Sequence, residues 1–140
     1  RDMTLSEKRR SIPVIEALSL PHIVIAATPL DGTVTSERAR RKCLELLLPT
    51  LEKEYGVSRL VLESRETSQD DRDLVFVRGL RSRRFISQLR VDFAPGFSDA
   101  RLWIADQALG AIGDAQRGRQ DFSSFLKTLD MRELDLHHLA

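Results

Sequence analysis

The sequence predicts an α/β fold in three layers, with a mostly parallel sheet flanked by helices. Strand-like and helix-like segments alternate along the chain in the order αβαβαβα, and a short further helix follows. Residues 22–28 form a continuous run rich in β-branched side chains, which is typical of a strand covered on both faces. Long helical segments separate the strands, as right-handed crossovers between parallel strands require.

The first half of the chain is expected to contain two helices around the strand at 22–28. A Thr-x-x-Glu capping box at residues 4–7 predicts the start of a helix over about residues 5–19. The longest helix is expected over residues 36–55, because leucines recur there every three or four positions and charged residues fill the opposite face. Pro49 should kink this helix, since proline has no backbone N–H to donate.

Two more strands are expected at residues 59–63 and 89–93. Between them a helix is predicted over about residues 69–82, with Ser68 as its N-cap and acidic residues in its first turn. The segment 89–93 alternates apolar and charged side chains, which predicts a strand at a sheet edge with one face in water.

The last part of the chain is expected to be helical. A small-residue helix that contains Asp106 should run to about Gln116, and a short amphipathic helix should bury Phe122 and Phe125. We therefore expect residues 118–140 to form a C-terminal helical appendage to the domain.

The composition is that of a single soluble domain spanning residues 1–140. Hydrophobic residues make up 41% of the 140 positions, and no run approaches the ~18 consecutive apolar residues of a membrane span. Cys43 is the one cysteine, so an internal disulfide is excluded and a buried, inert thiol is expected. No signal peptide is recognisable, which favours a cytoplasmic protein without a membrane partner. Since Met does not stand first, we expect a piece of a longer or processed polypeptide.

Two acidic residues are the candidate catalytic and metal-binding pair. Glu63 closes an apolar run at the end of a predicted strand, where α/β folds place their chemistry. Asp106 stands in an otherwise apolar helix, where a buried carboxylate costs free energy unless a partner or a metal offsets it. Together they would form a site for Mg²⁺ or Mn²⁺. The structural alternatives are an exposed Glu63 paired with Arg65, and an Asp106 capped by an arginine.

Arginine dominates the basic residues, because only four of the 22 are lysine. The tightest cluster lies at the end of the predicted helix 69–82 and in the loop after it, and consists of Arg78, Arg81, Arg83 and Arg84. Arginine binds phosphate bidentately, so Arg65, Arg81, Arg83 and Arg84 are candidate nucleic-acid contacts. The alternative is a solvated basic helix end that complements the helix macrodipole. The net charge of +1 excludes a strong attraction of the whole molecule to nucleic acid.

Two segments carry a resemblance to a known family. Leu62-Glu63-Ser64-Arg65, with the later helix LWIADQALGA at residues 102–111, resembles the second half of a bacterial family of unknown function with a ribonuclease-H-like fold. The family closes with a helix reading roughly Leu-Gln-x-Ala-Asp-x-x-Ala-Gly, and Trp103 stands here in place of the glutamine. The resemblance covers about residues 1–117. It implies that Glu63 and Asp106 bind divalent cations that activate water and stabilise a phosphoryl transition state.

The opening strand of that family, with its Asp-Glu-Ser-Gly motif, has no counterpart in this chain. The resemblance therefore implies that the N-terminal strands of a ribonuclease-H-like sheet are missing. We expect an upstream segment of the same protein, or a partner chain, to complete the sheet, because an open centre would leave backbone groups unpaired.

These observations leave more than one function open. The leading interpretation is a metal-dependent phosphodiesterase or nuclease-like domain that is incomplete with these residues alone. The alternative is a non-catalytic interaction or nucleic-acid-docking module with the same fold. A third is a different doubly wound domain that binds a small ligand at its strand ends. Motifs of nucleotide P-loops, Rossmann domains, α/β-hydrolases and zinc ribbons are not present in the sequence.

Overall fold

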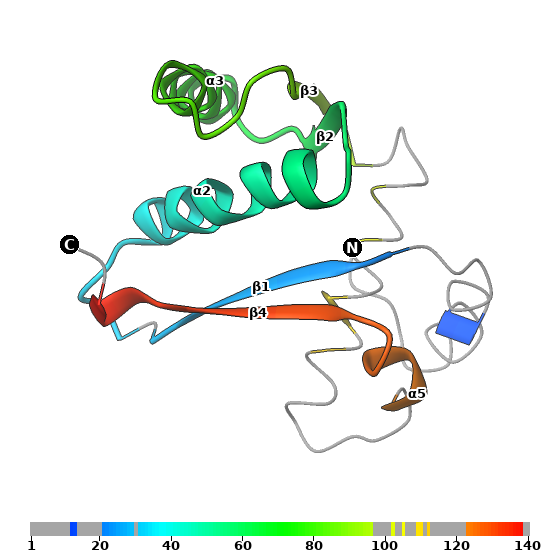
Figure 1. Ribbon diagram of the computed structural model, residues 1–140. Helices are drawn as coiled ribbons and strands as arrows, with labels where there is room; N and C mark the ends of the chain where they lie inside the picture. Colours follow the sequence, from blue (N-terminus) through cyan, green and yellow to red (C-terminus); the bar gives the residue numbers. More distant parts are fainter. Residues whose placement is uncertain are drawn as a thin grey trace. The chain divides into compact units, whose positions relative to one another are not determined.

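The structure is a computed structural model of residues 1–140, and it describes residues 12–13, 21–29, 31–96, 102, 105, 109–110, 112 and 123–138 (Figure 1). The elements with complete bounds are β1 (Ile23–Thr28), α2 (Ser36–Glu54), β2 (Arg59–Glu63), α3 (Thr67–Ser82), β3 (Arg90–Ala94), α5 (Ser123–Leu126), β4 (Asp130–Asp135) and the 3-10 helix η1 (Leu136–His138). Four of the predicted segments, 22–28, 36–55, 59–63 and 89–93, appear in these elements within one residue at each end.

The fold is α/β with parallel strands, as expected, but its described strands form two small sheets. One sheet contains β1 and β4, and the other contains β2 and β3. β2 and β3 pair in parallel, with Leu60 opposite Val91 and Glu63 opposite Ala94. In the first sheet, the N–H of Asp130 donates to the carbonyl of His22 (2.8 Å), so β1 and β4 begin at the same end.

The chain divides into two compact units. One consists of Arg1–Val24 and Phe97–Met131, and the other of Ile25–Gly96 and Arg132–Ala140. The prediction of one domain over residues 1–140 stays a prediction, and each unit is described by itself below. No helix in the described part of the chain has the length and apolar character needed to cross a bilayer.

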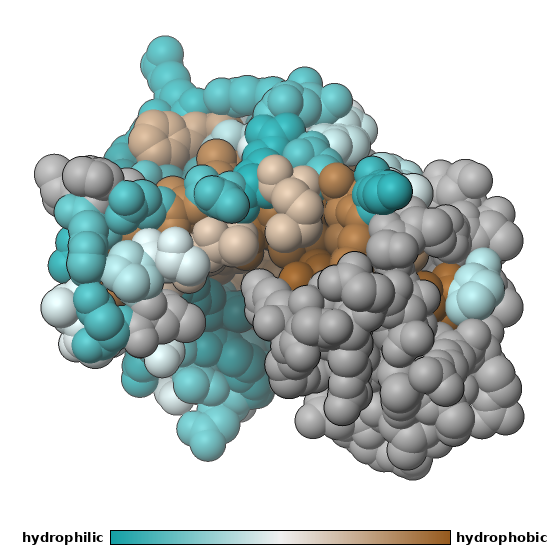
Figure 2. All heavy atoms as spheres, turned by 90° about the horizontal axis from the view of Figure 1, so that it is seen from below, coloured by the Kyte–Doolittle hydropathy of each residue, from teal (hydrophilic) through white to brown (hydrophobic). Residues whose placement is uncertain are grey.

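The core of the second unit lies between two helices and one face of the β2–β3 sheet. Leu60 of β2 and Val91 of β3, which are opposite each other, pack against this core. Its fully buried members come from α2, α3 and the segment after α3, and are Leu44, Leu48, Val77, Leu80, Ile86 and Leu89. Figure 2 shows one face on which hydrophobic side chains gather in a band bordered by hydrophilic ones.

The opposite face of the β2–β3 sheet is charged. Because side chains alternate between the two faces of a strand, the pairs on either side of Leu60 and Val91 point away from the core. These pairs are Arg59 opposite Arg90, and Val61 opposite Asp92. The charged residues of the third strand thus share one face, as predicted, with Arg90 exposed and Asp92 half-buried. Among the described residues α2 and α3 cover only one face of this sheet, which differs from the three layers that the sequence predicts.

Helix α2 follows the predicted segment closely. The Oγ1 atom of Thr35 accepts the N–H of Arg38 (3.2 Å) and caps the first turn. Pro49 lies inside the helix, and in the next position Thr50 Oγ1 donates to the carbonyl of Leu46 (2.8 Å). Gly56, with a φ of +64°, then ends the helix in the left-handed conformation that glycine adopts readily.

Helix α3 begins two residues before the predicted start, and its cap is not Ser68. The N-cap is Glu66, whose N–H donates to Oε1 of Gln69 (3.3 Å) in a capping-box arrangement. Asp70 accepts the backbone N–H of Arg65 (3.0 Å), so this first-turn acid also fixes the residue before the cap. The Ser68 prediction failed because a Glu-x-x-Gln pair, two residues earlier, satisfies the same backbone groups.

The C-terminal segment differs from the predicted helical appendage over residues 118–140. Residues 130–135 form strand β4, with Met131, Glu133 and Asp135 exposed and the residues between them half-buried. This is the period of two expected for a strand with one wet face. The short helix α5 does match the predicted helix there, and Phe125 is buried as expected, while Phe122 lies outside the described residues.

Two predicted helices fall largely outside the described residues. Of the helix expected over 5–19, residues 12 and 13 are described and helical. Of the helix that contains Asp106, residues 102, 105, 109, 110 and 112 are described and helical, but Asp106 itself is not among them.

His22 lies directly before β1 and packs against Phe125. Its ring meets that of Phe125 edge to face, with centroids 5.4 Å apart, and burial lowers its pKa from the ordinary value of 6.5. Because the folded protein favours neutral His22, we expect stability to fall as the pH drops from 6.5 to the folded pKa. An NMR titration of the imidazole checks this directly. A midpoint at or above 6.5 would contradict it.

Candidate functional site

The parallel β2–β3 sheet separates the predicted site residues into two groups. Glu63 and Arg65 lie at the carboxyl end of β2, whereas Arg81, Arg83 and Arg84 belong to the end of α3 and the turn before the amino end of β3. Each strand has five residues. At a rise of ~3.3 Å per residue the two ends of the sheet are about 13 Å apart. The five residues therefore lie in two groups at opposite ends of this sheet.

Glu63 lies at the carboxyl end of β2 with its side chain exposed. Its carboxyl group rests against Gly96, where a Cβ atom would be 2.7 Å from Cδ of Glu63. Because Gly96 has no Cβ atom, the Glu63 carboxylate can occupy this space. Glu63 makes no hydrogen bond or ion pair with another described residue, and Arg65 is not its partner.

Asp106 lies outside the described residues, so its pairing with Glu63 stays a prediction. Within the described residues, no group of three or more histidine, cysteine, aspartate or glutamate side chains is arranged to hold a metal ion. Cys43 is half-buried on α2, and burial raises the pKa of its thiol, consistent with the inert thiol expected from the sequence.

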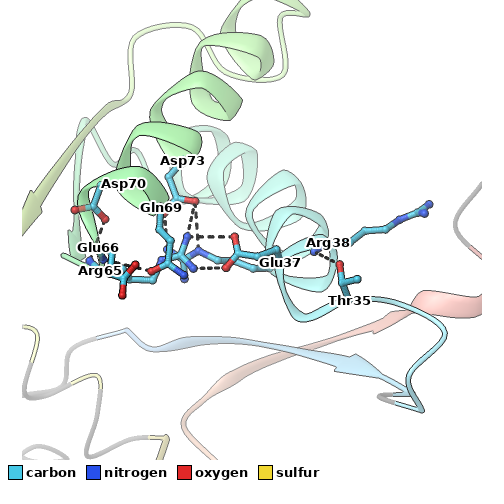
Figure 3. A network of polar contacts seen from close by, with 9 residues as sticks. Thr35, Glu37, Arg38, Arg65, Glu66, Gln69, Asp70 and Asp73 are labelled. Atoms are coloured by element: carbon cyan, nitrogen blue, oxygen red, sulfur yellow. Dashed lines mark hydrogen bonds and ion pairs between the residues drawn. The ribbon is translucent and has the colours of Figure 1, made fainter.

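Arg65 belongs to a network of charges that joins α2 to α3 (Figure 3). Its guanidinium group donates to both carboxylate oxygens of Glu37, and its Nη2 donates to Oδ1 of Asp73 (3.1 Å). Arg40 binds the other oxygen of Asp73 (2.9 Å). Asp73 is only 3% exposed, so its charge is balanced by two arginines rather than by water.

This network keeps Arg65 occupied. The hydrogen bond with Arg65 lowers the pKa of Glu37, and the same bond raises the pKa of Arg65. A phosphate group could bind Arg65 only by displacing one of its two carboxylates. Sequence reasoning missed Asp73, although a signal was present: Asp73 is four residues before Val77, on the buried side of α3.

At the amino end of the sheet, the predicted arginines play different parts. Arg81 donates to the carbonyl of Leu89 (2.6 Å) and holds the segment after α3. Arg83 donates to the carbonyl of Gly79 (3.4 Å), as expected for a basic residue at a helix end. Arg84 is exposed, with a φ of +64°, and its side chain, like that of Arg78, makes no hydrogen bond or ion pair to any described residue.

A carboxylate from α2 binds the loop before β3. Glu52 accepts the backbone N–H groups of Ser87 (2.7 Å), Gln88 (2.8 Å) and Leu89 (2.6 Å). Desolvation opposes the charged form of Glu52, but these three donors outweigh it, so the pKa of Glu52 lies below its ordinary value. The loop is thereby fixed between α2 and the start of β3.

Arg59 and Arg90 complete the charged surface at this end. They are opposite each other in β2 and β3, and both donate to Oδ2 of Asp92, at 2.6 Å and 3.4 Å. Arg59 is 56% exposed and Arg90 is 72% exposed. The hydrogen bond from Arg59 lowers the pKa of Asp92. The signal that sequence reasoning missed is that both predicted strands have an arginine at or next to their first position.

Comparison of the chain with models of protein families, with curated protein sequences and with solved structures gave no match.

Loss of the Glu52 carboxylate should destabilise the second unit. Glu52→Ala leaves three loop N–H groups without their acceptor, which should lower the free energy of unfolding by about 1–3 kcal/mol. In the unsubstituted protein, the stability that Glu52 contributes should be lost as the pH falls from 4.5, its ordinary pKa, to its lower pKa in the folded state. Urea denaturation at pH 7 and at low pH measures both effects.

The control variant is Glu45→Ala, which removes a glutamate 4.0 Å from Lys42 and should lower the free energy of unfolding by less than about 0.5 kcal/mol. Equal losses for the two variants would contradict the prediction.

Proposed function

We propose that the protein is a nucleic-acid-docking module and that the amino end of the β2–β3 sheet is its contact surface. The observation that carries the proposal is the set of exposed arginines around the fixed loop 83–89. Arg83 and Arg84 stand in the turn after α3, and Arg59 and Arg90 stand at the starts of the two strands. Each guanidinium group offers a planar pair of donors that matches phosphate oxygens.

The local charge balance supports this proposal. Asp92 neutralises part of the Arg59 and Arg90 charge, and the other nearby acid, Glu52, has its carboxylate occupied by backbone N–H groups. Four arginines thus outnumber the free carboxylates here, although the whole chain carries a net charge of only +1. At the carboxyl end the arginines Arg40 and Arg65 are bound by acids. An anionic polymer would therefore prefer the amino end.

Removal of two of these arginines should weaken nucleic-acid binding. In the double variant Arg84→Gln/Arg90→Gln, affinity for a labelled oligonucleotide should fall, and the slope of log K against log salt should shrink by about 1.4–1.8 as two phosphate contacts are lost. The matched control is Arg38→Gln/Arg41→Gln, which makes the same change in charge at exposed positions of α2 that have no ion pair with a described residue. Fluorescence anisotropy at several salt concentrations measures both. If the two double variants lose affinity equally, the proposed surface is wrong.

A second candidate function is a phosphodiesterase that uses Mg²⁺ or Mn²⁺. It is favoured by the exposed Glu63 carboxylate at the carboxyl end of β2, which no described side chain engages. A carboxylate oxygen is a ligand that these hard cations prefer. Asp106 would supply the second ligand, as the resemblance to the ribonuclease-H-like family implies. A further acid from an upstream segment or a partner chain would complete the centre.

Divalent metal should stabilise the protein if this second function holds. Addition of Mg²⁺ or Mn²⁺ should raise the melting temperature, because a ligand that binds only the folded state stabilises it. Glu63→Gln and Asp106→Asn should each abolish the increase, while the control Asp71→Asn, an exposed acid of α3, should keep it. Differential scanning fluorimetry with and without metal makes the comparison. An unchanged melting temperature of the unsubstituted intact protein, with the segment or partner that completes the centre, would reject the metal site.

A further inference from the structure

Phe85 is a large aromatic side chain in the turn after α3, and it is 36% exposed. Its neighbour Ile86 is 1% exposed and belongs to the core. The chain therefore turns one apolar side chain inward at this point and leaves the preceding ring partly in water. The residues just before the ring are Arg83 and Arg84, so the exposed ring lies within the arginine surface described above.

The turn that carries Phe85 is held from both sides. The N–H of Phe85 donates to the carbonyl of Leu80 (2.9 Å), and the N–H of Arg84 donates to the carbonyl of Arg81 (3.1 Å). On the far side, Glu52 binds three consecutive backbone N–H groups and Leu89 is buried in the core. A ring on a fixed backbone loses little conformational entropy when a ligand binds to it.

Arg83 lies over the Phe85 ring, with its Cζ atom 4.9 Å from the ring centroid. This is a cation–π distance, and the bond from Arg83 Nε to the carbonyl of Gly79 (3.4 Å) helps to hold it. A guanidinium group and an aromatic ring are the two kinds of planar group on which nucleic-acid bases stack. The remaining N–H groups of Arg83 face no described acceptor and can bind phosphate.

We infer that the docking surface takes single-stranded nucleic acid, DNA or RNA, and that Phe85 stacks on an unpaired base. This inference rests on the proposed nucleic-acid function. In a duplex the bases stack on one another, so no base face is available for an exposed aromatic ring to stack on. In a single strand a base can stack on Phe85 while Arg84 and Arg90 bind the flanking phosphates. The pairing of one exposed ring with several arginines therefore favours the single strand.

The test compares three ligands on the full chain by fluorescence anisotropy: a labelled single-stranded oligothymidylate, the same strand in a duplex, and inorganic polyphosphate as a competitor. We expect the single strand to bind more tightly than the duplex. Phe85→Leu should weaken single-strand binding roughly tenfold and leave the polyphosphate affinity unchanged. Phe85→Trp should retain binding, since it keeps a ring that can stack. The control Val75→Ala, at a 63% exposed apolar position of α3, should change neither affinity.

Phe85→Trp also provides a spectroscopic readout that does not depend on the stability of the leucine variant. Its fluorescence should be quenched by the single strand and not by polyphosphate, beyond any change in the unsubstituted chain, in which Trp103 is the one tryptophan. Equal binding of all three ligands, with no effect of Phe85→Leu and no added quenching, would overturn the stacking inference and leave the docking proposal standing. Polyglutamate is assayed as a fourth ligand, and its binding without binding of any nucleic acid would overturn both proposals in favour of an acidic protein partner.

Discussion

The hydrogen bonds between the Glu52 carboxylate and three consecutive backbone N–H groups are the constraint on which the amino-end surface depends. Ser87, Gln88 and Leu89 all donate to this one side chain of α2. A charged acceptor strengthens each bond, and loss of the acceptor would leave three loop donors to water. The turn 83–86 lies between these bonds and the end of α3. Its arginines and Phe85 can therefore present a defined surface although they belong to a loop.

The two ends of the β2–β3 sheet differ in how their charges are satisfied. At the carboxyl end, Asp73 binds both Arg40 and Arg65, and Glu37 binds Arg65 as well. This nearly neutral network fastens the first turns of α2 and α3 together, because breaking it would leave a buried charge unpaired. At the amino end the one intervening acid, Asp92, is shared by two arginines. At the amino end, therefore, Arg83, Arg84, Arg59 and Arg90 face one shared acid, whereas Arg40 and Arg65 are each bound by acids of the network.

Local sequence patterns predicted the helices and strands of the second unit well. They did not predict which residues far apart in the sequence contact each other. The leucine period of α2 and the apolar–charged alternation of β3 are properties of single segments. The structure agrees with both, since leucines of α2 are buried and Val91 packs against the core between Arg90 and Asp92. The bonds of Glu52 to the loop, and the position of Arg59 opposite Arg90, join residues more than 30 positions apart. They depend on strand register and helix packing, which one sequence does not reveal. β4 was missed because its alternating charged residues also suit an exposed helix end.

The most direct test of the amino-end surface is a ¹H–¹⁵N NMR titration of the full chain with a single-stranded oligothymidylate. The account predicts that chemical-shift changes concentrate on the amides of residues 83–87 and on the side-chain Nε–H of Arg90. The amides of residues 64–67, at the carboxyl end of β2, should stay unchanged. Shifts at residues 64–67 without shifts at residues 83–87 would contradict the account.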